Sequence, residues 1–235
     1  MHPNATTYAP WVQDWLTTDR FKTYLRAAGN NTQRAFDLYQ WNTAVNAALL
    51  HDFAHVEVAL RNALHRELSA FVQPSLTWLA APTALTLFPV AITTNSRTGA
   101  SYDTNEWLRG RLSDSRKKFN CSQSDHLLSP VAAGRIVADL TFGVWVELLH
   151  SRFEPTLWTN ALRNAFAQGI ARHEIYARLR TLNDVRNRLA HHEPNLKNAN
   201  KAHRELFWLL SVLDRDVQVH VRNHSKVAAL LASRP

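Results

Sequence analysis

The chain has 235 residues, with 27 lysines and arginines against 19 aspartates and glutamates, for a formal net charge of +8. This length suits one domain with a sizeable core, and an apolar fraction of 46% excludes wholesale disorder. Only six glycines argue against a β-rich fold and against glycine-rich nucleotide loops. The basic balance favours a polyanionic partner, with nucleic acid ahead of an anionic membrane.

Cysteine usage and hydropathy indicate the cellular compartment of the protein. The single Cys121 cannot form an intrachain disulfide or a zinc site by itself, and it is expected to be a buried or idle thiol. Residues 1–15 lack the basic and apolar runs of a secretory signal. The most apolar stretch, 131–149, carries Arg135 and Asp139 at the i,i+4 spacing of a soluble helix. We therefore expect a cytoplasmic protein with no membrane partner.

The first half of the chain shows helical periodicity in two places. Residues 11–28 predict one or two short helices, ending at the turn signal of residues 29–31. Residues 32–71 contain no proline or glycine, and apolar side chains recur at threes and fours. They predict one long, kinked amphipathic helix or two nearly collinear ones. Residues 74–105 contain Pro and Gly breakers and predict short turns with a long loop around 82–104.

The second half predicts a further series of helices, at about 103–119, 130–149, 154–166, 171–190 and 200–221, with a terminal turn near 225–231. Pro130 suits the first turn of its helix, and Pro194 ends the helix before it. No strand and no internal repeat is expected. The prediction is an all-α fold with an N-terminal helical cap (1–31), a helical domain (32–221) and a C-terminal tail (222–235).

The segment 183–194 carries the most distinctive chemistry. Arg186 and His191 enclose four residues, and Asn187 directly follows the arginine. Arginine can neutralise a phosphate and histidine can move a proton near neutral pH, which are the two tools for cutting RNA without a metal. On a straight helix these two side chains would lie about 140° apart. Either the helix ends near Ala190, or a second copy of the chain supplies part of the site.

Several polar residues lie on the same helix face as Arg186. Asn183, Arg186, Asn187 and Ala190 share one face, and Asn187 can hydrogen-bond His191. Simpler interpretations remain open. Arg186 can pair with an acid while His191 is a cation at a helix C-terminus, and Arg188 is either a phosphate contact or solvated. A metal site at residues 191–193 is disfavoured, because adjacent helical residues do not face one ion.

Two further clusters are candidates. Glu57, Arg61 and His65 are spaced i,i+4 on the long helix, with Asn62 beside them, and Arg61 to His65 is a shortened echo of Arg186 to His191. This cluster is either an intrahelical salt bridge or a support for the main pair. A basic run either tracks an RNA backbone or forms a solvated face; its members are Arg109, Arg111, Arg116, Lys117 and Lys118. Phe142 and Trp145 are expected in the core.

Four stretches of the chain form a further pattern: the run from Trp41 through His55-Val56-Glu57-Val58-Ala59-Leu60-Arg61-Asn62-Ala63-Leu64, then Leu140-Thr141-Phe142-Gly143-Val144-Trp145, then Val185-Arg186-Asn187-Arg188-Leu189-Ala190-His191-His192, and the helix that follows. Taken in this order, they resemble the Abi-like (abortive infection) proteins of the HEPN superfamily. Together they span about 32–221. The resemblance implies a HEPN-like helical bundle, usually dimeric, with the arginine and histidine near the two-fold axis and no cofactor.

The resemblance also implies roles for single residues. Arg186 and His191 take the catalytic positions and Asn187 the polar position after the arginine, while His192 is an alternative because the spacing varies within the superfamily. Glu57 and Arg61 match a family-typical polar pair. The implied activity is a metal-independent endoribonuclease of the abortive-infection or toxin–antitoxin type.

The expected reaction is attack of the ribose 2′-OH, giving a 2′,3′-cyclic phosphate and a 5′-OH. Expected partners are RNA, a second copy of the chain, and a protein or RNA antitoxin. The alternatives are a non-catalytic RNA-binding or interaction module, or a nucleotide-modification or sensing partner that holds a phosphate with Arg186.

Overall fold

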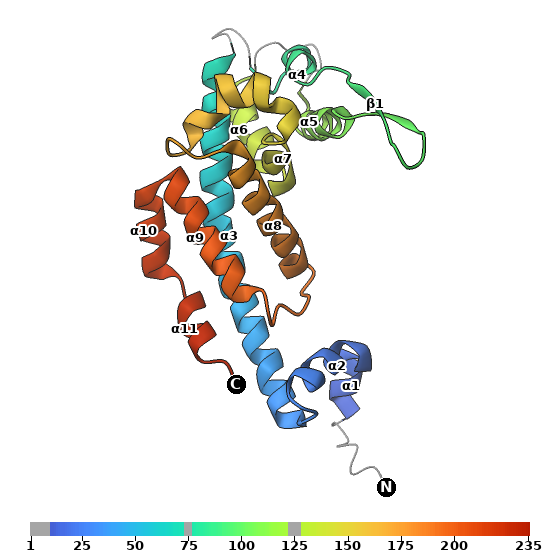
Figure 1. Ribbon diagram of the computed structural model, residues 1–235, viewed down its shortest axis with the longest axis vertical. Helices are drawn as coiled ribbons and strands as arrows, with labels where there is room; N and C mark the ends of the chain where they lie inside the picture. Colours follow the sequence, from blue (N-terminus) through green and yellow to red (C-terminus); the bar gives the residue numbers. More distant parts are fainter. Residues whose placement is uncertain (1–9, 73–76, 122–127) are drawn as a thin grey trace. The chain divides into compact units, whose positions relative to one another are not determined.

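A computed structural model describes residues 10–72, 77–121 and 128–235. The described chain is mainly helical and carries one small antiparallel sheet (Figure 1). The predicted all-α fold class is therefore confirmed. None of the helices in this described part combines the length and apolarity that crossing a membrane requires.

The predicted N-terminal helices are two, α1 (Pro10–Leu16) and α2 (Thr18–Ala27). Behind them, Gly29 and Asn30 adopt left-handed backbone angles, with φ of 63° and 64°. Such angles reverse the chain after a helix, and they favour glycine and asparagine. The Asn31 side chain then accepts from the Arg34 N–H at 2.9 Å, which satisfies a free donor at the start of the next helix.

That next helix, α3 (Thr32–Phe71), is a single 40-residue element (Figure 1). The absence of proline and glycine leaves its backbone ladder uninterrupted. Its apolar repeat is the buried stripe, with residues Leu38, Trp41, Val45, Leu49, Phe53, Val56, Leu60, Leu64 and Leu68 all in the core. The sequence predicted either one long helix or two nearly collinear helices over 32–71, and the structure has one.

The segment predicted as a long loop around 82–104 is more ordered than expected. It contains helix α4 (Ala81–Leu87) and a hairpin of β1 (Ile92–Thr94) and β2 (Ser101–Asp103), with Thr93 opposite Tyr102. The expectation of no strands was wrong here. Three-residue strands are too short to show alternation, and the hairpin depends on a local turn in which the Asn95 side chain accepts from the Arg97 N–H at 2.9 Å.

The remaining elements follow in the order α5 (Glu106–Lys118), α6 (Pro130–Asp139), α7 (Phe142–Glu147), η1 (Ser151–Phe153), η2 (Glu154–Trp158), η3 (Leu162–Ala165), α8 (Arg172–Ala190), α9 (Ala199–Leu213), α10 (Arg215–His224) and α11 (Val227–Ala232). Two predicted helices are each divided. The 130–149 helix breaks because Leu140 and Thr141 are extended, with ψ of 125° and 158°. The 200–221 helix breaks at Asp214, whose carboxylate caps α10 by accepting from the Asp216 and Val217 N–H groups.

The predicted short helix at 154–166 is also different in detail. Its first part is the single π turn η2, and its second is the 3₁₀ turn η3. Pro155 lies at the start of η2, where its missing N–H costs nothing. By contrast, α8 agrees closely with the predicted helix at 171–190.

The contacts within the chain define two units. Among the described residues, the first comprises 10–55, 184–208 and 219–235, and the second comprises 56–72, 77–121, 128–183 and 209–218. Within the described parts, the first unit buries Tyr24 and Phe53, and the second buries Trp78 and Trp145 in edge-to-face contact at 5.9 Å. The predicted division into cap, domain and tail remains a prediction.

Candidate functional site

The last turn of α8 creates the geometry around the predicted arginine–histidine pair. Leu179, Leu182, Val185 and Leu189 form its buried stripe. The helix ends at Ala190, so His191 is the C-cap residue, with its N–H still bound to the Asn187 carbonyl at 3.1 Å. The helix thus ends near Ala190, as predicted, but the His191 N–H keeps the regular i→i−4 bond, so His191 still lies about 140° around the helix axis from Arg186.

A Schellman motif terminates the helix. The His192 N–H donates to the Leu189 carbonyl at 3.0 Å, and the Glu193 N–H donates to the Arg188 carbonyl at 2.9 Å. His192 has a φ of 54°, a left-handed angle that usually belongs to glycine at this position. A histidine held in this conformation stores backbone strain, so other contacts must hold the helix end.

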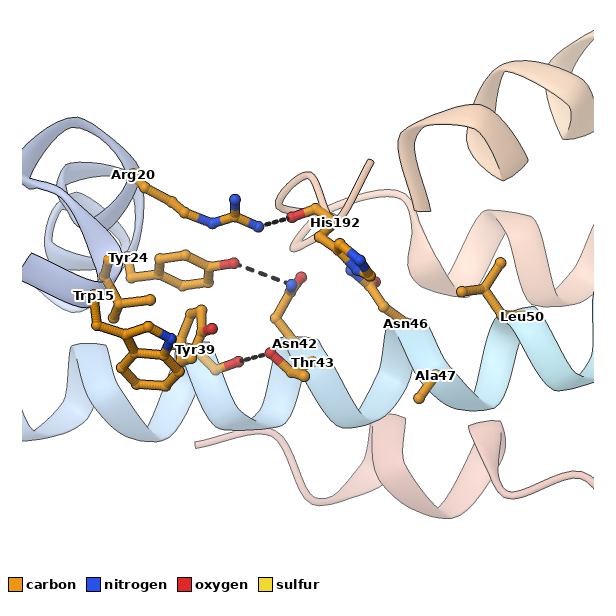
Figure 2. A pocket seen from close by; sticks show the side chains of 11 residues that line it. Trp15, Arg20, Tyr24, Tyr39, Asn42, Thr43, Asn46, Ala47, Leu50 and His192 are labelled. Carbon is orange, nitrogen blue, oxygen red and sulfur yellow. Dashed lines mark hydrogen bonds between the residues drawn. The ribbon is translucent and has the colours of Figure 1, made fainter. Parts of the chain in front are cut away.

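Three side chains from α2 and α3 provide those contacts. The Arg20 guanidinium donates to the His192 carbonyl, as Figure 2 shows. Asn46 donates through Nδ2 to the Glu193 carbonyl at 3.2 Å, and the Asn42 Oδ1 accepts from the Asn195 N–H at 2.8 Å. The backbone that follows His191 is thereby tied to α2 and α3 by successive hydrogen bonds.

The predicted site residues on α8 differ in exposure. Arg186 is half-buried, whereas Asn187, His191 and His192 are exposed. Asn183 is half-buried, and its Oδ1 lies 3.8 Å from where a Cβ would stand at Gly143 of α7. Exposure of the imidazoles leaves them accessible to a large substrate such as RNA.

The Arg188 side chain forms an ion pair at the end of its own helix. Its Nε donates to the Glu193 carboxylate at 3.0 Å, and both side chains are about half exposed. Such an exposed pair contributes little to stability and is easily exchanged for a phosphate. A role for Arg188 in RNA binding therefore stays a prediction.

The second predicted cluster, on α3, is built differently. The His65 Nδ1 accepts from the indole N–H of the fully buried Trp78 at 2.9 Å. Burial lowers the pKa of His65 below its ordinary value. The Nε of Arg61 is buried without a hydrogen-bond partner among the described residues, and Glu57 is half-buried. His65 therefore serves to satisfy a core tryptophan.

Most side chains of the basic run on α5 already bind groups within the same unit. Arg109 donates to the Phe88 carbonyl and to Asp103, and the buried Arg116 donates to the Leu79 carbonyl at 2.6 Å. Arg111 pairs with Asp114 at 3.0 Å, and Lys118 pairs with Asp139. Lys117 is exposed. Of the five side chains, Arg116 is the least able to reach a phosphate.

A cavity of about 340 Å³ lies beside the end of α8 (Figure 2). Its wall is formed by α1, α2, α3 and His192, and the lining residues are Trp15, Leu16, Arg20, Tyr24, Tyr39, Asn42, Thr43, Asn46, Ala47, Leu50 and His192. We call it the Asn46 pocket. None of its residues except His192 was singled out from the sequence. The signal available in the sequence was the i,i+4 spacing of two amides, Asn42 and Asn46, beside the apolar stripe of α3. The structure shows that both amides are buried.

A family model described as Abi-like protein matches residues 4–196. The chain belongs to the Abi-like protein family. The matched range includes α3, the Phe142-Gly143 segment and the end of α8. Comparison with curated proteins and with solved structures gave no match.

This Abi-like chain also carries a row of four imidazoles that the sequence reasoning missed. His51 and His55 of α3 and His220 and His224 of α10 follow one another, with ring centroids 5.0, 6.1 and 4.5 Å apart. Burial first, and then His51 and His220, lower the pKa of His55. Across the described ranges, no group of three or more His, Cys, Asp or Glu side chains is arranged to hold a metal ion.

Beside this row, the buried Asp52 accepts from Ser225 Oγ at 2.6 Å and pairs with His51 at 3.1 Å. The carboxylate is thus satisfied inside the Abi-like chain. The i,i+4 spacing of each histidine pair is visible in the sequence. Their meeting depends on α10 packing against α3, which no local pattern indicates.

Proposed function

We propose that this Abi-like protein is a metal-independent endoribonuclease of the HEPN type that acts in abortive infection or as a toxin. One observation carries the proposal. In a chain of this family, α8 ends directly before His191, which leaves the imidazole exposed one turn beyond the half-buried Arg186. Within one copy the two side chains lie about 140° apart around the helix axis, so the proposal needs a second copy of the chain to bring an arginine and a histidine together.

The reaction uses the RNA's own nucleophile. The ribose 2′-oxygen attacks the adjacent phosphorus while the bond from phosphorus to the 5′-oxygen breaks. A histidine takes the 2′-OH proton, and a protonated histidine or water returns one to the departing 5′-oxygen. Arg186 stabilises the charge that develops on the phosphoryl oxygens. The products are a 2′,3′-cyclic phosphate and a 5′-OH, and DNA is spared because it lacks the 2′-OH.

We propose that the active form is a homodimer in which two α8 ends face each other. A composite site would let the histidine of one copy work with the arginine of the other. Asn187, which lies between them in sequence and is exposed, would orient an imidazole. The net charge of +8 supports binding of a polyanion, and an antitoxin of protein or RNA would restrain the activity.

The deciding experiment incubates purified protein with single-stranded RNA in excess chelator and maps the new ends. We expect cyclic-phosphate and 5′-OH termini from the wild type, and no cleavage by the Arg186→Ala and His191→Ala variants. Retention of cleavage in both variants would overturn the proposal. Salt-dependent RNA binding without any cleavage would support the alternative function, a non-catalytic RNA-binding module.

A further inference from the structure

The Asn46 pocket combines flat aromatic rings with amide groups. Its aromatic lining is Trp15, Tyr24 and Tyr39, and its amides are Asn42 and Asn46. At about 340 Å³ it falls within the size range of small-molecule sites. Aromatic faces and a few placed polar groups are the means by which proteins hold single unpaired bases.

Asn46, which lines this pocket, carries an unsatisfied acceptor. Its side chain is only 6% exposed, and its Nδ2 donates to the Glu193 carbonyl at 3.2 Å. A carbonyl can only accept, so this contact fixes which end of the amide is the NH₂ group. The Oδ1 is left buried without a hydrogen-bond partner in the described chain. An N–H from a ligand would satisfy it.

The amide of the neighbouring Asn42 is already occupied at both ends. The Asn42 Nδ2 donates to the Tyr24 hydroxyl at 3.0 Å (Figure 2). The Asn42 Oδ1 accepts from the Asn195 N–H. Burial raises the pKa of Tyr24 to about 12, so the phenol is neutral and does not repel a nucleotide. Both ends of the Asn42 amide are therefore occupied, whereas the Asn46 Oδ1 has no partner in the described chain.

Trp15 offers a stacking surface at the same pocket. Its side chain is 53% exposed, although Tyr39 meets it edge-on at 5.4 Å and Trp11 stacks on it at 5.9 Å. The flanking rings orient the indole, and half of its surface remains available. Stacking on such a ring accepts any base, because every base has a π-face.

The pocket borders the proposed catalytic end of α8. Arg20 and His192 line it, and the Arg20 guanidinium is hydrogen-bonded to the His192 carbonyl. A nucleotide base in the pocket would therefore lie beside a fixed positive charge and one residue from His191. This places a strand across the histidine that the proposed function uses.

We propose that the Asn46 pocket binds one unpaired base of single-stranded RNA, stacked on Trp15 and donating an N–H to Asn46. The inference deepens the proposed function and rests on it for the identity of the ligand. It restricts the substrate to single-stranded or looped RNA, since a base-paired strand cannot present a free base edge. The pocket thereby positions the strand, while Arg186 and His191 carry out the chemistry.

The test uses a strand that cannot be cleaved. The probe is a 2′-O-methyl oligouridylate with a single 2-aminopurine, whose fluorescence falls when it stacks on an indole. We expect the wild type to quench the probe and to bind it about tenfold more tightly than the same strand in a duplex. Trp15→Leu should abolish the quenching, and Asn46→Leu should weaken binding by about tenfold. Trp107→Leu changes a similarly exposed tryptophan on α5, outside the pocket, and is the matched control that should keep the quenching.

Equal quenching by wild type and Trp15→Leu, or equal affinity for single strand and duplex, would overturn the inference. Loss of quenching in Trp107→Leu as well would show that the quenching does not arise in the Asn46 pocket and would also overturn the inference. If Asn46→Leu fails to fold, the quenching by Trp15→Leu and the comparison of single strand with duplex still test the inference. Because the probe lacks a 2′-OH, these results are independent of whether the protein cleaves RNA, so the two proposals fail separately.

Discussion

Two segments of this chain contain an arginine followed shortly by a histidine, and they have different structures. Arg61 and His65 lie inside the continuous helix α3, where His65 accepts from the buried Trp78. Arg186 and His191 straddle the end of α8, and His191 is exposed. The same residue types are thus used once to complete a core and once to form an accessible helix end.

The difference shows that a motif of this kind acquires chemical meaning from where its helix stops. His191 is the C-cap of α8, where the regular turns end, whereas His65 lies in the interior of α3. The backbone there is fixed by a Schellman motif and by hydrogen bonds from Arg20, Asn42 and Asn46. The α3 segment has no such end, so its histidine is held against the neighbouring core.

The largest expected effect is on cleavage. His191→Ala should lower the rate constant for RNA cleavage by about 10²–10⁴-fold, because a positioned proton carrier is lost. His173→Ala changes an exposed histidine on the same helix and should stay within about twofold of wild type. Single-turnover assays in chelator measure both, and a similar loss in the two variants would contradict the assignment.

The second effect concerns the α3 histidine. His65→Leu should lower the free energy of unfolding by about 1–3 kcal/mol, because the buried Trp78 N–H loses its acceptor. Cleavage per folded molecule should persist. Adding Trp78→Phe removes the donor as well and should cost less than the sum of the single changes. Urea unfolding of the two single variants and the double variant measures this coupling, and strict additivity would refute the pairing.

The third effect is on pH-dependent stability. Burial lowers the pKa values of His55, His65, His150 and His203 in the folded protein. As the pH falls below about 6.5, the unfolded chain binds protons first, so the free energy of unfolding decreases towards pH 5. The pKa of Asp103, lowered to about 2 chiefly by the Ala91 N–H and Arg109, places its loss of stability at lower pH. Urea unfolding at pH 8 and pH 5.5 checks the direction.

A variant provides the control for this pH effect. His65→Leu removes one of the four groups, so its unfolding free energy should fall less between pH 8 and pH 5.5 than that of the wild type. An equal or steeper decrease in the variant would show that His65 does not contribute.

The smallest expected effect separates the two adjacent histidines. His192→Gly relieves the left-handed strain at φ 54° and should change the free energy of unfolding by no more than about 1 kcal/mol, in the stabilising direction. Its cleavage should fall less than that of His191→Ala. Thermal unfolding and the same cleavage assay measure both quantities, and a greater loss of activity in His192→Gly would make His192 the catalytic histidine.

Much of the fold was predictable because long amphipathic helices repeat their signal over many residues. The uninterrupted stripe of α3 and the helix at 172–190 were both expected from the sequence. The breaks at Leu140 and Asp214 and the short hairpin were missed, since each depends on two or three residues. A capping carboxylate or a turn carries too little sequence to outweigh an apolar repeat on both sides.

The candidate site, like the fold, was predictable from the sequence only in part. The sequence by itself determined the composition of the α8 face and, through Pro194, the approximate end of its helix, because backbone geometry is a local property. Only the tertiary structure decided that His65 meets Trp78 and that Arg20, Asn42 and Asn46 hold residues 192–195. Those contacts join residues far apart in the chain, and their partners are selected by packing and by the need to satisfy buried polar groups.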